Sequence, residues 1–220
     1  MANLERAPSV GIPMDLAIHE GMLAVPPAAK GLVLFAHGSG SGRLSPRNNY
    51  VAGVLREHGV ATLLFDLLTE EEDRIYENRF NIDLLTHRLL LATQWAGHQA
   101  ATRELALGYF GASTGAAAAL KAAADLGRQI RAVVSRGGRP DLALDELPRV
   151  QAPTLLMVGG NDTAVIELNR TAYRELSAEK ELKIIPGATH LFEEPGTLEQ
   201  VAAVAARWFE RHLTGTRTET

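Results

Sequence analysis

Short apolar runs alternate with longer segments of helical periodicity along most of the chain. The runs that suit strands are Leu16–Val25, Leu32–Ala36, Ala61–Phe65, Leu105–Phe110, Ala132–Ser135, Thr154–Val158 and Leu182–Ile185. The segments that suit helices are Asn48–Glu57, Asn81–Trp95, Thr114–Leu126, Val165–Leu176 and Thr197–Leu213. Continuous apolar runs are typical of strands that are buried on both faces. The alternation therefore predicts an α/β fold, with a mostly parallel central sheet and helices on both faces.

The length of the chain favours a single domain. With 220 residues, 46% of them hydrophobic and 22% charged, the chain has the size and composition of one globular α/β unit. We expect this domain to span residues 1–213 and the polar tail 214–220 to be disordered. Only residues 137–153 separate two of the later expected strands, which leaves room for one short helix at Leu142–Leu147 and none for a cap domain.

The net charge, the N-terminal segment and the lengths of the apolar runs indicate which classes of protein the chain can belong to. A net charge of −4 argues against nucleic acid or an anionic membrane as a partner. The N-terminal segment lacks the basic patch and apolar core of a signal peptide, and no apolar run reaches the roughly 18–20 residues of a membrane span. We therefore expect a cytoplasmic protein. The chain has no cysteine, which excludes disulfides, thiolate metal sites and a cysteine nucleophile.

The pentapeptide GASTG, residues 111–115, lies between an expected strand and an expected helix. A Gly-x-Ser-x-Gly turn in this position holds its serine in a strained conformation, with the hydroxyl exposed above the sheet. The glycines are needed because side chains there would clash with the neighbouring strand or helix. Glycine-rich turns between strands and helices are common, so it is the strand–turn–helix context that favours Ser113 as a nucleophile.

A nucleophilic serine needs a base, and an acid that orients the base. Asp162 follows one expected strand and His190 follows the last, so the three residues occur in the chain order serine, acid, histidine. Loops at the carboxyl ends of parallel strands converge on one edge of the sheet. Asp162 is also suited to be the N-cap of the next helix, and the two roles are compatible. Asp141, Glu193 and Glu194 are rival acids, although the two glutamates are too close to His190 in the sequence to reach back easily. His190 could instead be an ordinary surface histidine.

The loop HGSGSG, residues 37–42, has the glycine content that lets backbone N–H groups approach a reacting carbonyl. We expect the N–H groups of Ser39 and Thr114 to bind the oxyanion, with Gly40 as the alternative to Ser39. The loop lacks the spacing of a dinucleotide-binding motif or a P-loop, and we interpret His37 as a structural residue beneath it. The remaining histidines show no paired spacing of metal ligands, so we expect neither a metal nor an organic cofactor.

The chain resembles the α/β-hydrolases, in particular the dienelactone-hydrolase-like branch, in the stretches LFAHGSGSG, GYFGASTG, VVSRGGRPDLA, LLMVGGND and GATHLFEEP. The resemblance extends from about Leu16 to Leu213. It implies the α/β-hydrolase fold and a hydrolytic triad. Dienelactone hydrolases use a cysteine at the elbow, whereas this chain has Ser113, so the resemblance does not imply a dienelactone as the substrate.

Together these residues predict a serine hydrolase that cleaves small-molecule carboxylic esters or lactones through an acyl-enzyme. Arg136 and Arg139 could hold a substrate carboxylate, as the resemblance to hydrolases of acidic lactones suggests, and Arg47 is a further candidate. All three could equally be solvated charges. The alternative functions are an acyltransferase that uses the same triad and a hydrolase-fold binding protein whose triad is silent.

Overall fold

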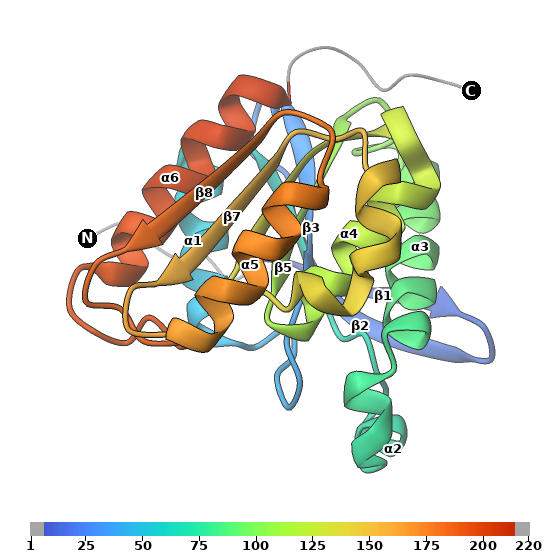
Figure 1. The fold of residues 1–220 in the computed structure, drawn as a ribbon. Helices are drawn as coiled ribbons and strands as arrows, with labels where there is room; N and C mark the ends of the chain where they lie inside the picture. Colours follow the sequence, from blue (N-terminus) through green and yellow to red (C-terminus); the bar gives the residue numbers. More distant parts are fainter. Residues whose placement is uncertain (1–6, 214–220) are drawn as a thin grey trace.

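An eight-stranded sheet forms the centre of the molecule, in the order β1-β2-β4-β3-β5-β6-β7-β8 (Figure 1). The computed structural model describes residues 7–213, so the tail expected to be disordered lies outside the described residues. The strands are β1 (Ser9–Met14), β2 (Ala17–Ala24), β3 (Gly31–Ala36), β4 (Ala61–Phe65), β5 (Ala106–Ala112), β6 (Ile130–Arg136), β7 (Thr154–Gly159) and β8 (Lys180–Ile185). β2 pairs antiparallel with β1 and β4, and all the other pairs are parallel. The predicted mostly parallel sheet is confirmed.

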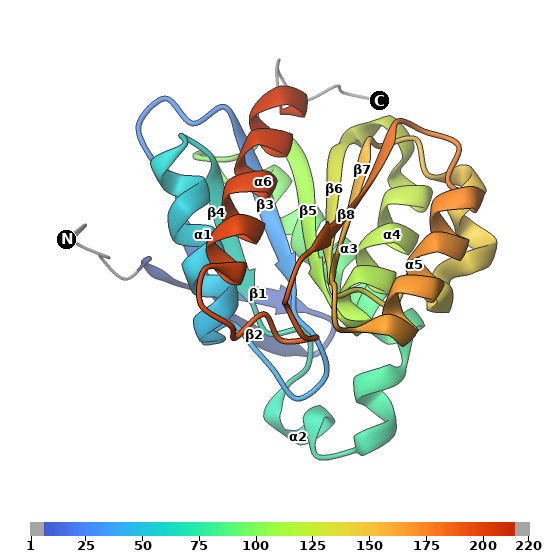
Figure 2. The same ribbon diagram turned by 60° about the vertical axis from the view of Figure 1, so that its left-hand side comes forward.

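Helices cover both faces of this sheet. The α-helices are α1 (Pro46–Glu57), α2 (Glu70–Asp73), α3 (Ile82–His98), α4 (Thr114–Leu126), α5 (Thr163–Glu175) and α6 (Thr197–His212). The 3-10 helices are η1 (Tyr76–Phe80), η2 (Gly127–Gln129) and η3 (Pro140–Arg149). Figures 1 and 2 show α1 and α6 on one face and α3, α4 and α5 on the other. Between β6 and β7 the chain forms only η3, which confirms the expectation of a fold without a cap domain.

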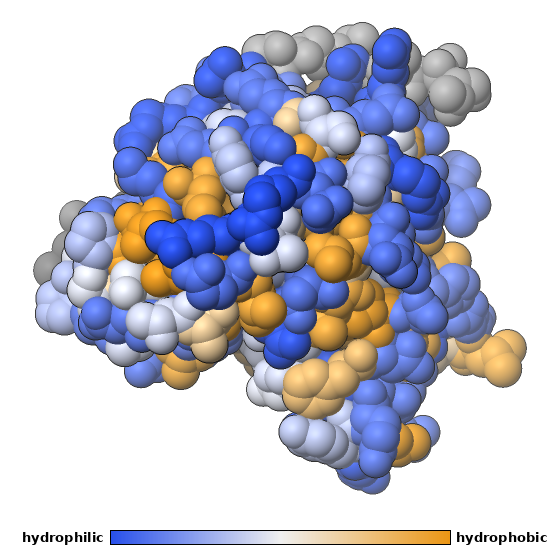
Figure 3. All heavy atoms as spheres, in the orientation of Figure 1, coloured by the Kyte–Doolittle hydropathy of each residue, from blue (hydrophilic) through white to orange (hydrophobic). Residues whose placement is uncertain are grey.

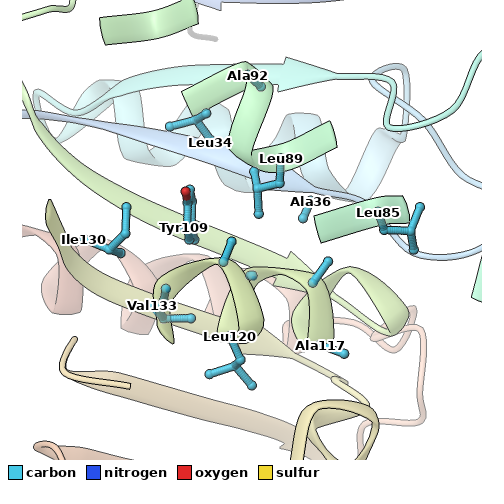
Figure 4. Packing of buried hydrophobic residues seen from close by; sticks show 14 of the residues in the cluster. Leu34, Ala36, Leu85, Leu89, Ala92, Tyr109, Ala117, Leu120, Ile130 and Val133 are labelled. Carbon is cyan, nitrogen blue, oxygen red and sulfur yellow. The ribbon is translucent and has the colours of Figure 1, made fainter. Parts of the chain in front are cut away.

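The core lies in two layers, one on each side of the sheet. Leu34 and Tyr109 pack with Leu89 of α3 in the layer beneath α3 and α4 (Figure 4). The next residues along the same strands, Phe35 and Phe110, belong to the opposite layer, with their ring centroids 4.9 Å apart. Successive side chains of a strand point to opposite faces, and both faces are covered. This explains why the central strands are continuous apolar runs in the sequence.

The N-terminal hairpin differs from the sequence prediction. β1 is absent from the strands predicted above, because Gly11 and Pro13 interrupt its apolar pattern. It pairs along its whole length with β2, from Ser9 opposite Met22 to Met14 opposite Ala17. β1 is an edge strand, where a proline costs no hydrogen bond of a central ladder.

The segment Glu70–Phe80 is a second departure, since the sequence pattern predicts neither α2 nor η1. Figures 1 and 2 show α2 projecting beyond the carboxyl edge of the sheet. A capping box begins the segment: the Thr69 hydroxyl accepts from the Glu72 N–H at 3.1 Å, and the Glu72 carboxylate accepts from the Thr69 N–H at 2.9 Å. Arg88 of α3, almost fully buried, pairs with Glu72 at 2.5 Å and with Asp15 of the hairpin turn. The segment is therefore fixed to the body by ion pairs between distant residues.

The surface is polar over much of the face seen in Figure 1, with apolar patches between the charged residues (Figure 3). Two of the most exposed apolar side chains are Leu16, at the turn between β1 and β2, and Ile18, near the start of β2. Within residues 7–213, the helices are too short or too polar to cross a bilayer.

Candidate active site

Ser113 occupies the sharp turn between β5 and α4. Its backbone has φ 51° and ψ −121°, a conformation that a non-glycine residue rarely adopts. Hydrogen bonds hold this turn: the Ser113 N–H donates to the Arg136 carbonyl at 3.2 Å, and the Ser113 carbonyl accepts from the N–H groups of Ala116 and Arg139, each at 3.1 Å. A strained backbone persists only where its surroundings fix it, and such strain clusters at functional sites. The turn has the geometry of a nucleophile elbow.

The two glycines of the pentapeptide make this turn sterically possible. A Cβ on Gly111 would lie 2.4 Å from the Cα of Ala116 in α4. A Cβ on Gly115 would lie 2.2 Å from the carbonyl oxygen of Ala36, at the end of β3. These distances are far inside van der Waals contact, so only glycine lets α4 begin directly against the neighbouring strand. The clash that the sequence predicted for larger residues is found at both positions.

Asp162 and His190 lie within hydrogen-bond distance of each other. The Nδ1 atom of His190 is 2.6 Å from Oδ2 of Asp162, a short contact of the kind that charge-assisted hydrogen bonds show. Asp162 stands at the N-cap position of α5, yet its side chain caps no N–H group of that helix. The rival acid, Asp141, is instead bound to Arg139 by hydrogen bonds of 2.9 and 2.8 Å. Of the candidate acids, it is Asp162 that forms a hydrogen bond with the histidine.

The loop that carries His190 is stabilised by hydrogen bonds between its own residues and by a side chain buried in the core. The Glu194 carboxylate accepts from the Thr189 N–H at 3.1 Å and from its hydroxyl at 2.6 Å, and these hydrogen bonds lower the pKa of Glu194 below its usual value. Phe192, two residues after the histidine, is buried in the core and anchors the loop there. A Cβ on Gly137 would lie 3.2 Å from the His190 carbonyl oxygen, so the loop after β6 leaves little free space beside the histidine.

Ser113 and His190 line the same cavity at the carboxyl edge of the sheet. This cavity has a volume of about 210 Å³. Its remaining lining residues are Gly38, Ser39, Ser41, Ser45, Arg47, Ala112, Arg136 and Leu191. The His190 side chain is 38% exposed and that of Asp162 is 15% exposed, so the histidine is the more accessible of the two. Ser113 and His190 thus line one cavity, and Asp162 contacts His190, although 77 positions separate Ser113 from His190 in the chain.

The glycine loop after β3 lies directly against the serine. A Cβ on Gly38 would be 3.0 Å from the Cβ of Ser113, which shows how closely the loop backbone approaches. Ser39 lines the cavity, and Thr114 is the first residue of α4. Within the described residues, neither the Ser39 N–H nor the Thr114 N–H has a hydrogen-bond partner. Both N–H groups are therefore unoccupied, as the oxyanion role predicted for them requires.

His37 lies beneath this loop and joins it to the loop after β4. Its Nδ1 donates to the Gly38 carbonyl at 3.0 Å, and its Nε2 accepts from the Leu67 N–H at 2.9 Å. These two partners require a neutral imidazole with the proton on Nδ1. Burial lowers the pKa of His37 below its ordinary value of 6.5, against the opposing effect of the Gly38 carbonyl. The residue is a structural support of the loop, as its sequence position suggests.

A His37→Gln variant is expected to lose less stability on acidification than the wild type. The folded protein holds His37 neutral, whereas the unfolded chain takes up a proton below about pH 6.5. The contribution of His37 to the free energy of unfolding is therefore fully present above this pH. As the pH falls below it, this contribution decreases by up to about 1.4 kcal/mol per pH unit. Urea unfolding at pH 7, 6 and 5 measures the slope. Equal slopes in the variant and the wild type would contradict the assignment.

The arginines near the site differ from the pair that the sequence suggests. Arg136 lines the cavity, but the Arg139 guanidinium is engaged by Asp141 outside the cavity lining. The second arginine of the lining is Arg47, at the start of α1, which pairs with Glu193 at 2.9 Å. The structure therefore does not bring Arg136 and Arg139 together at the cavity. In the described part of the chain, no group of three or more His, Asp or Glu side chains could hold a metal ion.

Comparisons with known proteins identify the family and the fold of the chain. The family described as "Alpha/beta hydrolase domain" matches residues 29–208. A dienelactone hydrolase from Anabaena variabilis is 54% identical in sequence, and its crystal structure matches with a TM-score of 0.90 over 93% of this chain and 97% of that chain. Est1E from Butyrivibrio proteoclasticus shares the fold, with a TM-score of 0.80, 18% identity and coverage of 92% of this chain and 98% of that chain.

Longer relatives contain the same domain. Two strains of Mycobacterium tuberculosis have a protein, provisionally named a phosphoribosyl transferase, that is 60% identical over 195 residues. The match covers 89% of this chain but only 44% of those proteins, so the chain spans less than half of their length. The match to the family over residues 29–208 and the likeness to the Anabaena enzyme show that the chain belongs to the α/β-hydrolase family, in its dienelactone-hydrolase-like branch.

Proposed function

We propose that this protein is a serine hydrolase that cleaves carboxylic esters or lactones. The observation that carries the proposal is the 2.6 Å contact between His190 and Asp162 at the edge of the cavity that also contains the strained Ser113. A histidine oriented by a carboxylate next to an elbow serine is the arrangement that activates a hydroxyl for attack on a carbonyl.

In the proposed reaction, the Ser113 hydroxyl oxygen attacks the substrate carbonyl, and His190 Nε2 accepts the hydroxyl proton. Asp162 fixes the other ring nitrogen as the N–H tautomer and stabilises the imidazolium that forms. The N–H groups of Ser39 and Thr114 bind the oxyanion of the tetrahedral intermediate. His190 then returns the proton to the leaving alkoxide, which leaves an acyl group on Ser113. A water molecule that gives its proton to His190 hydrolyses this ester and regenerates the serine.

The surroundings of the histidine favour water as the acceptor of the acyl group. His190 is 38% exposed, and within residues 7–213 no cap domain covers the cavity, so water reaches the base that must activate it. The relative named a dienelactone hydrolase supports lactones, which are cyclic esters, within the proposed substrate class. An acyltransferase would need a site that excludes water, and nothing in the lining of the cavity supplies such a barrier.

A fluorophosphonate probe tests the proposal directly, because it reacts with activated serines. Wild-type protein should be labelled stoichiometrically, and mass spectrometry of the digested protein should place the label on Ser113. Ser113→Ala should remain unlabelled. Ser41→Ala, which removes an exposed serine of the same cavity, should be labelled like the wild type. An unlabelled wild-type protein would favour a binding protein with a silent triad, and a label on another residue would overturn the assignment of the nucleophile.

A further inference from the structure

A second cavity lies at the carboxyl edge of the sheet, between β2 and the projecting segment that begins with α2 (Figure 2). Its volume is about 360 Å³, which is larger than that of the cavity beside Ser113. The two cavities adjoin at Ser41, a residue of the glycine loop that lines both of them. A ligand that occupies the second cavity can therefore lie close to the elbow serine, although the proposed reaction itself makes no use of this space.

Negative charge predominates in the lining of this second cavity. The lining includes four carboxylates, those of Glu20, Asp66, Glu70 and Asp73. Within residues 7–213, its only lysine or arginine is Arg43, which pairs with both Glu20 and Asp66. Asp73 pairs with Arg79 at 2.7 Å, whereas Glu70 forms no ion pair in the described part of the chain. The carboxylates thus outnumber the cations beside them, and we refer to this space as the acidic cavity.

His19 contributes a buried hydrogen-bond acceptor to the wall of the acidic cavity. The residue is only 2% exposed, and its Nδ1 donates to the Asp66 carbonyl at 2.8 Å. In the neutral ring, Nε2 is then an acceptor, and it has no partner among residues 7–213. Buried polar groups are normally hydrogen-bonded. This unpaired acceptor indicates that a ligand with a hydrogen-bond donor belongs at this wall.

The acidic cavity also has an apolar side. Ile18 and Leu68 line it together with the carboxylates, and the Ile18 side chain is 72% exposed. An exposed isoleucine beside a cavity gains free energy when a hydrocarbon group covers it. The ligand that suits this lining therefore combines hydrogen-bond donors and a positive charge with a short hydrocarbon stem.

We propose that the acidic cavity binds the ammonium group of a cationic ester or lactone whose carbonyl lies at Ser113. This inference rests on the proposed hydrolase function and names its substrate class. An alkylammonium group has three donors and no acceptor, so it complements a lining of carboxylates and an unpaired imidazole nitrogen. Its charge offsets the excess of carboxylates, and its alkyl stem packs on Ile18. A neutral hydroxyl group donates one hydrogen bond but gains nothing from the charge of the cavity.

Matched esters test the acidic cavity. The ethyl esters of aminohexanoic, aminoheptanoic and aminooctanoic acid, each with its amine at the end of the chain, carry an ammonium group at pH 7. Esters that end in a hydroxyl or a methyl group at the same position are uncharged. At low salt, the wild type should hydrolyse at least one amino ester with a kcat/KM roughly 10-fold or more above both uncharged partners. This preference should decrease at high salt, because salt screens the charges. Acetates of the matching amino alcohols test the same cavity with the ammonium group on the alcohol side.

Two neighbouring glutamates of α2 provide a matched pair of variants. Glu70→Gln should lower the preference for the amino ester roughly 3- to 5-fold, the range of an exposed ion pair, and Glu70→Lys roughly 10-fold or more. Glu71→Gln and Glu71→Lys change the same charges at a residue that does not line the acidic cavity, so they should keep most of the preference. Thermal unfolding reports whether each variant folds. A wild type that does not prefer the amino ester to both uncharged esters, or equal losses in Glu70→Lys and Glu71→Lys, would overturn the proposal.

A binding measurement keeps this inference distinct from the proposed function. Titration of hexylammonium chloride and of hexanol into Ser113→Ala, followed by NMR of the backbone amides, requires no turnover. Hexylammonium should bind more tightly than hexanol and shift the amide signals of His19 and Glu70, and Glu70→Lys in the same background should weaken its binding roughly 10-fold. If the wild type hydrolyses no ester but this binding is found, the hydrolase proposal fails and the cation site stands. If esters are hydrolysed but hexylammonium does not bind, the cation site fails and the hydrolase proposal stands.

Discussion

Ser113→Ala is expected to lower kcat for an ester substrate by about 10⁵- to 10⁶-fold, the loss seen when the nucleophile of a serine–histidine–acid triad is removed. The reason is that no other group of the cavity lining can form the acyl-enzyme: the remaining hydroxyls, those of Ser39, Ser41 and Ser45, lie on the loop opposite the elbow or cap α1. Residual activity should come from the oxyanion donors and from substrate binding alone. The low kcat of Ser113→Ala can be measured in stopped assays at high enzyme concentration.

The folding of this variant must be shown independently. Ser113→Ala keeps the unfavourable backbone conformation with φ 51°, so its free energy of unfolding should stay close to that of the wild type. Ser113→Gly relieves the strain and should be equally inactive but more stable, by about 1 kcal/mol. A loss of activity of less than about 100-fold in both folded variants would show that another residue carries the chemistry.

The positions of the candidate site residues at the strand ends could be predicted from the sequence because short, local signals place them. The elbow pentapeptide needs only its own glycines and the flanking strand and helix, and both glycines are indeed in contacts too close for a side chain. Asp162 and His190 follow β7 and β8, whose apolar runs are plain in the sequence. Once a parallel sheet is inferred, its topology brings the loops at the strand ends together, so the sequence separation of the residues does not matter.

The segment Glu70–Phe80 and the arginines near the site depend on contacts that no local sequence pattern predicts. The segment Glu70–Phe80 has no apolar periodicity, and Arg88 holds it through Glu72, which lies 16 residues away, and through Asp15, 73 residues away. The predicted substrate-binding arginines divide in the structure: Arg136 lines the cavity and Arg139 does not. Asp141, two residues after Arg139, is a partner that the sequence could have indicated, whereas the approach of Arg47 to Glu193 spans 146 residues.

Asp162→Asn is expected to lower kcat by about 10³- to 10⁴-fold while leaving the fold intact. The carboxylate accepts from His190 Nδ1 at 2.6 Å, and this fixes the tautomer in which Nε2 is free to take the proton of Ser113. An asparagine amide of the same shape can donate to Nδ1 and so stabilise the opposite tautomer, with the proton on Nε2, which cannot act as a base. Because Asp162 caps no N–H group of α5, the substitution should not weaken that helix.

The rival acid provides the matched control for this prediction. Asp141→Asn removes the same charge from the neighbouring loop but breaks only the partly exposed pair with Arg139, so kcat should change by less than about threefold. Restoration of the carboxylate at a different length, as in Asp162→Glu, should recover part of the activity because an acceptor for the Nδ1 proton returns. If Asp141→Asn lost more activity than Asp162→Asn, the hydrogen bond between Asp162 and His190 would not be the one that orients the base. The role of the triad acid would then have to be reassigned to Asp141, in the loop after β6.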